Sequence, residues 1–330
     1  SAQIGALSTV QNAGLTSTQV GALTTTQESG LNPTQIGALT TSQEVGLTST
    51  QIISLTSLQA SGLTQTAVTY LTTTQFSVLT TTQIVGFTTS AITGLTTTQI
   101  ASLSSTQESG LSSTQIGVLL TSQLPGLKST QIVSLTTTQE SGLTSTQIGS
   151  LTTSQEASLT TTQIVALTSA QSTGLNSTQL SSLTTTQYSG LTTTQIIGLT
   201  TTGLTGLSST QINILTTTQE AGLTSTQISA LATTQEAGFT TTQIVALTSS
   251  QASGLTSTEV TSLSTTQFAA LSSLQITGLT TSGFGGLSST RIASLSTAQE
   301  AGLTSTQLSS FTTTQFAALT AAQIGFLTTT

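Results

Sequence analysis

The chain of 330 residues has no His, Cys, Met or Trp, and because its nine acidic residues are all Glu it has no Asp either. Without His, Cys or Asp the sequence offers no Ser-His-Asp or Cys-His relay, no zinc ligand set and no Asp-rich calcium loop. Its many Ser and Thr hydroxyl groups lack a base that would activate them. We therefore predict a protein that is not an enzyme and that uses no metal or cofactor.

Charge is also scarce, since only 3% of the residues are charged, against about a quarter in an ordinary soluble domain. Two basic residues and a net charge of −7 cannot neutralise a phosphate backbone, which argues against nucleic acid as a partner. No stretch approaches the roughly 18 consecutive apolar residues that a membrane helix needs, so we expect no membrane insertion. A disordered chain is not indicated either, because 34% of the residues are hydrophobic.

One repeat of eight residues fills the chain. Leu recurs every eighth residue from Leu7 to Leu327, at 41 positions that are interrupted only by Phe87, Phe239 and Phe311. Counted from this Leu, the consensus Leu-Thr-Thr-Thr-Gln-Ile-x-x occupies columns one to eight. Column six is Ile, Val or Leu in every second octad and permissive in the octads between, so the full unit has sixteen residues. The register has no insertion, and we predict a single array over 1–330 without a domain boundary.

The octad carries the signals of a helix start. Ser or Thr in column two with Gln three residues later forms a capping box, and Leu before the cap with Ile four positions into the helix forms the accompanying hydrophobic staple. Pro33 supports this interpretation because it follows Asn32, a good cap, at the first helical position. Column eight is often Gly, as at Gly14 and Gly30, where we expect a left-handed residue to end each helix.

These signals predict an all-α repeat, a solenoid of very short capped helices. A continuous helix fails because eight residues at about 100° each turn the Leu away by about 80° per octad. Such short helices do not form alone, so stacking must stabilise them. The alternative is a β-solenoid, which the Thr triplets and regular Gly residues favour and which would present a repetitive surface for ice or carbohydrate.

Three groups of side chains are candidates for a special role. The eight Glu residues in column six lie in a first helical turn, and we expect them to be solvated there. Lys128, Glu259 and Arg291 replace consensus residues, and we interpret them as surface variation. Aromatic residues in the permissive column either fill gaps in the core or form an apolar patch that contacts another chain; they are Phe76, Tyr188, Phe268, Phe284 and Phe316.

The core predicted from columns one and six is thin for the length of the chain, and a nearly uncharged surface offers little repulsion between copies. We therefore expect self-association. The sequence also resembles the Thr/Gln-rich octad tracts of very large exported bacterial surface and adhesin-like proteins, as in Leu95-Thr96-Thr97-Thr98-Gln99-Ile100. This resemblance implies a location outside the bacterial cell and a structural role as a filament, sheath or stalk, with no active site carried over.

Overall fold

The computed structural model describes residues 2–327, and there the octad folds as the capping signals predict. These residues form forty short α-helices and one 3₁₀-helix, with no strand, so the chain is an all-α repeat and the β-solenoid alternative is wrong. The chain divides into two compact units, unit 1 (Ser1–Ala166) and unit 2 (Leu167–Thr330), which we describe separately. The single array without a boundary stays a prediction.

Unit 1 contains the first twenty α-helices and the 3₁₀-helix, all of three to six residues. Their bounds are α1 (Ala2–Gly5), α2 (Thr9–Ala13), α3 (Ser17–Gly21), α4 (Thr25–Glu28), α5 (Pro33–Gly37), α6 (Thr41–Gly46), α7 (Ser49–Ser54), α8 (Ser57–Ala60), α9 (Gln65–Tyr70), α10 (Thr73–Ser77), α11 (Thr81–Gly86), α12 (Thr89–Ile92), α13 (Thr97–Ser102), α14 (Ser105–Glu108), α15 (Ser113–Gly117), η1 (Leu124–Gly126), α16 (Ser129–Ser134), α17 (Thr137–Glu140), α18 (Ser145–Gly149), α19 (Thr153–Ala157) and α20 (Thr161–Ala166).

Unit 2 continues the same pattern with twenty α-helices. Their bounds are α21 (Ser169–Ser172), α22 (Ser177–Ser182), α23 (Thr185–Ser189), α24 (Thr193–Gly198), α25 (Thr201–Leu204), α26 (Ser209–Asn213), α27 (Thr217–Glu220), α28 (Ser225–Ile228), α29 (Thr233–Glu236), α30 (Thr241–Ala246), α31 (Ser249–Ala252), α32 (Ser257–Ser262), α33 (Thr265–Ala269), α34 (Ser273–Gly278), α35 (Thr281–Gly285), α36 (Ser289–Ala293), α37 (Thr297–Glu300), α38 (Ser305–Ser309), α39 (Thr313–Ala317) and α40 (Ala321–Leu327).

The capping box is visible in the octad that contains α11. The Thr80 hydroxyl accepts the backbone N–H of Gln83 at 3.3 Å, and the Gln83 side-chain oxygen accepts the N–H of Thr80 at 2.8 Å. Pro33 occupies the first turn of α5 behind the Asn32 cap, as predicted. Two donors that a helix start leaves unpaired are thus satisfied within each octad that carries both the cap hydroxyl and the Gln.

The same Gln has a second function that joins one turn of the solenoid to the next. Its amide nitrogen donates to the Ile52 carbonyl at 2.6 Å and to the Leu55 carbonyl at 2.8 Å, 31 and 28 residues earlier. Equivalent bonds recur along both units, as at Gln147 and Gln243. The column-five Gln is therefore a buried clamp between turns as well as a cap, which explains why it is nearly invariant.

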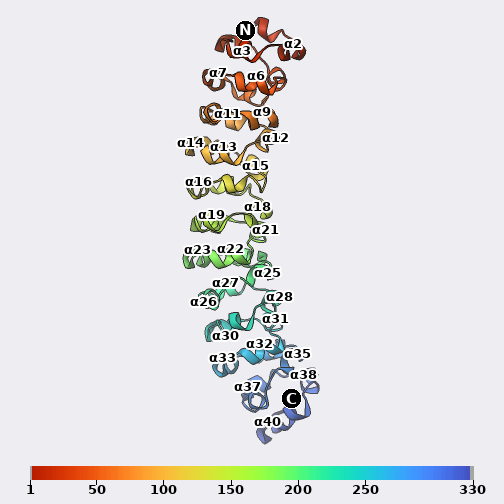
Figure 1. The fold of residues 1–330 in the computed structure, drawn as a ribbon. Helices are drawn as coiled ribbons and strands as arrows, with labels where there is room; N and C mark the ends of the chain where they lie inside the picture. Colours follow the sequence, from red (N-terminus) through yellow and green to blue (C-terminus); the bar gives the residue numbers. More distant parts are fainter. Residues whose placement is uncertain (1, 328–330) are drawn as a thin grey trace. The chain divides into compact units, whose positions relative to one another are not determined.

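Within each unit the helices wind in layers, and most of them pack on the third helix before them (Figure 1). In unit 1, for example, α8 contacts α11, which contacts α14, which contacts α16. The Gln83 clamp reaches Ile52 in the octad four places back and Leu55 in the octad three places back, so a turn takes more than three octads and fewer than four. The sixteen-residue alternation in the sequence is therefore not the repeat of the superhelix.

The core runs inside these layers and is built from columns one and six. Leu79 and Ile84 are 3% and 1% exposed, and the residues of the permissive octads at column six are equally buried from Asn12 to Glu300, whereas Phe316 is exposed. Both kinds of octad thus point column six inward, since that residue lies one turn into a helix whose inner face is set by the Leu. The permissive column accepts varied residues although it lies in the core.

The glycines of column eight do not have the predicted left-handed conformation. No described Gly has a positive φ, so these residues do not end their helices in the left-handed conformation. They mark close approaches between turns instead: a Cβ on Gly62 would lie 2.2 Å from the Pro33 carbonyl oxygen, and one on Gly142 would lie 1.9 Å from that of Ser113. The side chain is absent because the neighbouring backbone occupies its place.

Ala232 allows the contribution of one side-chain cap to the free energy of unfolding to be measured. Its φ and ψ of −75° and 153° match the other caps, but its methyl group cannot accept the Gln235 N–H. Ala232→Thr is therefore expected to stabilise α29 by about 1 kcal/mol, the usual size of a cap, and Thr216→Ala to destabilise α27 by a similar amount. Urea unfolding followed by circular dichroism checks both; shifts of the same sign would contradict the assignment.

Candidate functional site

The glutamates form the most unusual feature of the structure, because they point into the core. Each is at most 3% exposed, so the expectation that the column-six carboxyl groups are solvated is wrong, and Glu259 is not surface variation. The buried set comprises Glu28, Glu44, Glu108, Glu140, Glu156, Glu220, Glu236, Glu259 and Glu300. For eight of them the reason is the helical register, which turns column six toward the inside of the stack. Glu259 stands in column five, where the Gln residues of most other octads are buried as well.

Some of these carboxyl groups have one hydrogen-bond donor from the next turn. The hydroxyl of Ser54 donates to Glu28 at 3.0 Å, and that of Ser134 donates to Glu108 at 2.7 Å, in each case from column eight of the octad 26 residues on. The other oxygen of each is buried without a partner. Glu220 has neither oxygen paired. Buried carboxylates in such surroundings lack the donors that would stabilise a negative charge.

Burial shifts the ionisation of these groups. It raises the pKa of Glu28 and Glu108 to about 7, although their Ser donors pull in the opposite direction, and it also raises that of Glu44 to about 7. The pKa of Glu140 and Glu220 rises to about 8 for the same reason. The cause is desolvation, which penalises the charged form. At pH 7 the groups with a pKa of about 8 are therefore mostly protonated, and those with a pKa of about 7 are about half protonated.

Glu236 of α29 and Glu259 of α32 are a pair, since their helices pack together and their side chains form a carboxyl–carboxyl contact. Burial is the main cause that raises the pKa of both, and repulsion from Glu259 raises that of Glu236 further. The Ser262 hydroxyl donates to Glu236 at 3.3 Å, and Glu259 accepts the Thr256 N–H. Two buried carboxyl groups in contact are stable when they share a proton.

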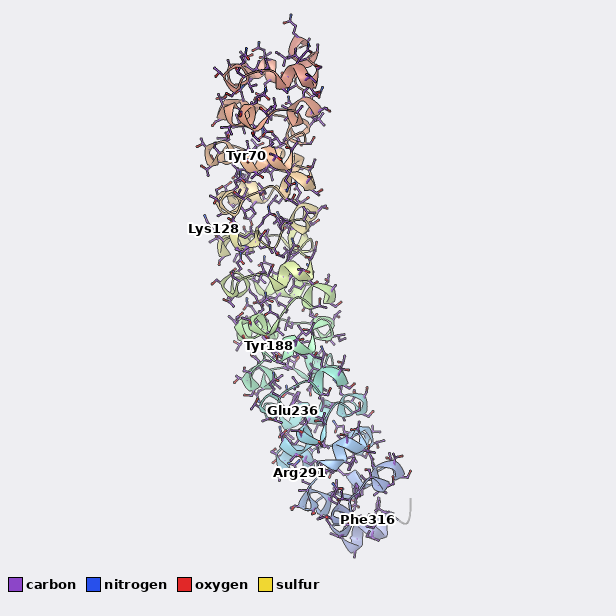
Figure 2. The ribbon with its side chains drawn as sticks, turned by 45° about the vertical axis from the view of Figure 1, so that its right-hand side comes forward. Tyr70, Lys128, Tyr188, Glu236, Arg291 and Phe316 are labelled. Carbon is purple, nitrogen blue, oxygen red and sulfur yellow. The ribbon has the colours of Figure 1, made fainter. Side chains whose placement is uncertain are left out.

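Arg291 also stands in column five and is not surface variation. Its guanidinium donates to the carbonyls of Val260 and Leu263, the positions that a Gln in this column would reach, and lies 5.3 Å from the ring centre of Phe268. Lys128, in contrast, is exposed as expected (Figure 2). Its backbone still completes the cap of α16 through the Gln131 side chain.

Four of the five aromatic candidates for contact with another chain are buried. Phe76, Tyr188, Phe268 and Phe284 are at most 2% exposed, so they fill the interior and do not present a surface to a partner. The Tyr188 hydroxyl has no hydrogen-bond partner there, and burial raises its pKa. Only Phe316, which is 52% exposed, keeps the position that an intermolecular contact requires (Figure 2).

Sequence reasoning missed the apolar side chains that are exposed. Column seven carries a β-branched aliphatic residue after the inward Ile or Glu in several octads, and each is about half exposed: Val45, Ile53, Val85, Val133, Val165, Ile197 and Val245. The signal was present in doublets such as Ile52–Ile53 and Ile84–Val85. Only the first member of such a doublet faces the core.

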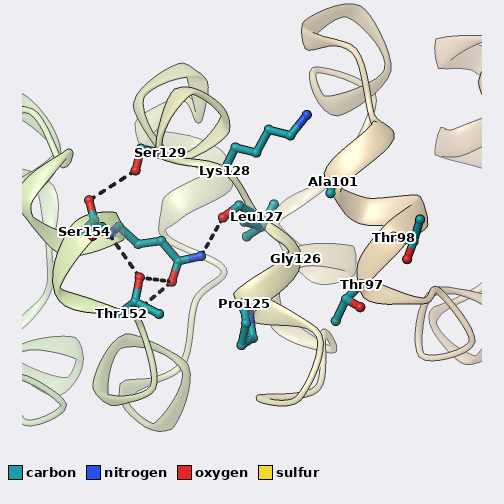
Figure 3. A pocket seen from close by; sticks show the side chains of 11 residues that line it. Thr97, Thr98, Ala101, Pro125, Gly126, Leu127, Lys128, Ser129, Thr152 and Ser154 are labelled. Atoms are coloured by element: carbon teal, nitrogen blue, oxygen red, sulfur yellow. Dashed lines mark hydrogen bonds between the residues drawn. The ribbon is translucent and has the colours of Figure 1, made fainter.

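The surface hollows are open, and Ser and Thr side chains line each of them together with glycine or apolar residues. One of about 620 Å³ lies beside η1, where Pro125 and Gly126 replace a regular helix (Figure 3). The Gln155 amide there donates to the Leu124 and Leu127 carbonyls at 2.7 Å, and the Ser129 hydroxyl donates to the Ser154 carbonyl at 3.2 Å. The Gln155 and Ser129 side chains are thus used for contacts within the solenoid.

Within residues 2–327 no group of three or more His, Cys, Asp or Glu side chains is placed to hold a metal ion. The helices of that region are also too short to cross a bilayer. No protein-family model matches the chain, and no curated protein is a significant match to it. The resemblance to exported octad tracts stays a prediction.

Proposed function

We propose that the chain is a non-catalytic structural protein, a repeat solenoid that associates with copies of itself in a filament, sheath or adhesin stalk outside a bacterial cell. The observation that carries the proposal is the Gln clamp, repeated with the same two carbonyl partners from Gln43 in unit 1 to Gln315 in unit 2. Side chains that a binding protein would direct at a ligand are directed here at the neighbouring turn.

The surface supports association of copies. All nine glutamates are buried, so among the described residues the exposed charge comes from Lys128 and the part-exposed Arg291. Charge repulsion between copies is correspondingly weak. The exposed aliphatic side chains of column seven add apolar area that a contact between copies would bury.

Association is tested by light scattering and negative-stain microscopy over a range of protein concentrations. The wild-type chain is expected to form oligomers or fibres, and a triple variant Ile53→Thr, Val85→Thr, Val133→Thr should need about tenfold more protein to do so, because apolar area is lost without a change of charge. Thr50→Ser, Thr82→Ser, Thr130→Ser is the matched control at exposed column-four positions. A wild-type chain that stays monomeric at high concentration contradicts the proposal.

A further inference from the structure

We propose that the solenoid is a proton-dependent fold: the interior carboxyl groups of Glu28, Glu44, Glu108, Glu220, Glu236 and Glu259 are built in as neutral acids, and their ionisation in mild alkali opens the stack at the octads that carry them. The proposal concerns the folding of the single chain and is independent of self-association.

The surroundings of these carboxyl groups do not compensate a negative charge. Glu220 of α27 packs between α24 and α30, neither of which carries a titratable residue, and both its oxygens are buried without a partner. Glu44 of α6 faces α3, which has none, and α9, which has the half-exposed Tyr70. A buried carboxylate with no cation and no donor is unstable, whereas the protonated acid is a small polar group.

The two basic residues of the chain do not neutralise the buried carboxyl groups. Glu108 of α14 packs on α11, which has no titratable residue, and on α16, which follows Lys128, but the Lys128 side chain is exposed at the surface. The Arg291 guanidinium is occupied by the carbonyls of Val260 and Leu263. Glu28 of α4 packs on α1 and α7, which contain no titratable group, and its one donor is the neutral Ser54.

Glu259 supplies a geometric argument of a different kind. Column five needs a donor, because a Gln there gives its amide hydrogens to two carbonyl oxygens of an earlier turn. By register the carbonyls opposite Glu259 are those of Ile228 and Leu231. A carboxylate has no hydrogen to give, whereas a carboxylic acid has one. No basic residue faces the neighbouring Glu236 from α26 or α32. Because two adjacent carboxylates would repel, this neighbour also requires that at least one of the two groups is protonated.

The sign of the effect follows from the direction of the shifts. Because burial raises the pKa of these groups above the value of about 4.5 that they have when unfolded, the folded chain binds more protons. The free energy of unfolding is therefore highest below pH 4.5 and falls as the pH rises from 4.5 to the folded pKa values of about 7 to 8. Between the unfolded and folded values, each carboxyl group raises the local opening constant about tenfold per pH unit.

Hydrogen exchange can measure this within one molecule. After correction for intrinsic exchange rates, the protection of α27, which carries Glu220, is expected to fall about tenfold per pH unit relative to α25. That helix carries Leu204 in the same column and packs on α22 and α28, neither of which carries a Glu. Glu220→Gln should abolish the difference, because the amide is neutral at every pH. Equal pH dependence of α27 and α25 in the wild-type chain overturns the proposal.

A measurement on the wild-type chain alone covers the case in which the variant does not fold. Infrared spectroscopy with ¹³C-labelled Glu detects the carbonyl stretch of protonated carboxylic acids. We expect this band to be present at pH 6 and to disappear above neutrality, with a parallel loss of helical circular dichroism. Its absence at pH 6 would mean that the glutamates are ionised in the folded chain, which overturns the proposal.

Discussion

Replacing Gln83 with Glu is expected to destabilise the stack around α11 by about 4 kcal/mol at pH 9, because two buried carbonyl oxygens lose their donor and face a negative charge. The substitution leaves the cap intact: a Glu oxygen can accept the Thr80 N–H as the Gln oxygen does at 2.8 Å. What is removed is the donation to Ile52 and Leu55, at 2.6 and 2.8 Å. The experiment thus separates the clamp from the cap.

The same variant should be less damaging at pH 5, with a loss of about 2 kcal/mol, since a protonated Glu can donate to one of the two carbonyls. Gln11→Glu is the matched control. Gln11 caps α2 through the Ser8 N–H at 2.9 Å but is exposed, so its substitution should cost less than about 0.5 kcal/mol.

Hydrogen exchange of α8 and α11, combined with urea unfolding, measures these effects locally, which a repeat protein requires because its unfolding need not be two-state. If Gln83→Glu and Gln11→Glu have the same small effect, the clamp contributes nothing beyond the cap.

The local structure could be predicted from the sequence because it depends on neighbours in the chain. The capping box of Thr80 and Gln83 and the first-turn position of Pro33 are set within four residues, and the sequence contains all of those residues. The preference for helix over strand could also be predicted, because it depends on hydrogen bonds within one octad.

The contacts between turns could not be predicted, because they depend on the size of the turn. The octad of Glu44 alone predicts a charged residue in the first turn of a helix. Its burial becomes visible only when the neighbouring layers, α3 and α9, are placed against it. The second role of Gln83 needs partners 28 and 31 residues away, a distance that no motif encodes. For the same reason the sequence predicts a role in ending helices for the column-eight glycines. Their requirement for a hydrogen in place of a side chain comes from backbone atoms of a neighbouring turn.

The close approach of two turns at a column-eight glycine gives the second large effect. Gly206→Ala is expected to destabilise unit 2 by about 3 kcal/mol, at the upper end of the range for overpacked sites. A Cβ there would lie 1.9 Å from the Ser177 carbonyl oxygen and 2.6 Å from the Ser177 Cα. Both atoms belong to backbone, so no side chain can rotate away. The contact between α22 and α25 must open to admit the methyl group.

Gly285→Ala provides the control within the same unit. Gly285 ends α35, and nothing lies within 4 Å of the position that its Cβ would take. Because Ala is the better helix former, this variant should be neutral or more stable by about 0.5 kcal/mol. Urea unfolding gives the overall effect, and hydrogen exchange of α22 and α25 locates it. If both variants lose the same stability, the cost comes from the loss of backbone freedom and the close approach of turns does not explain the glycines.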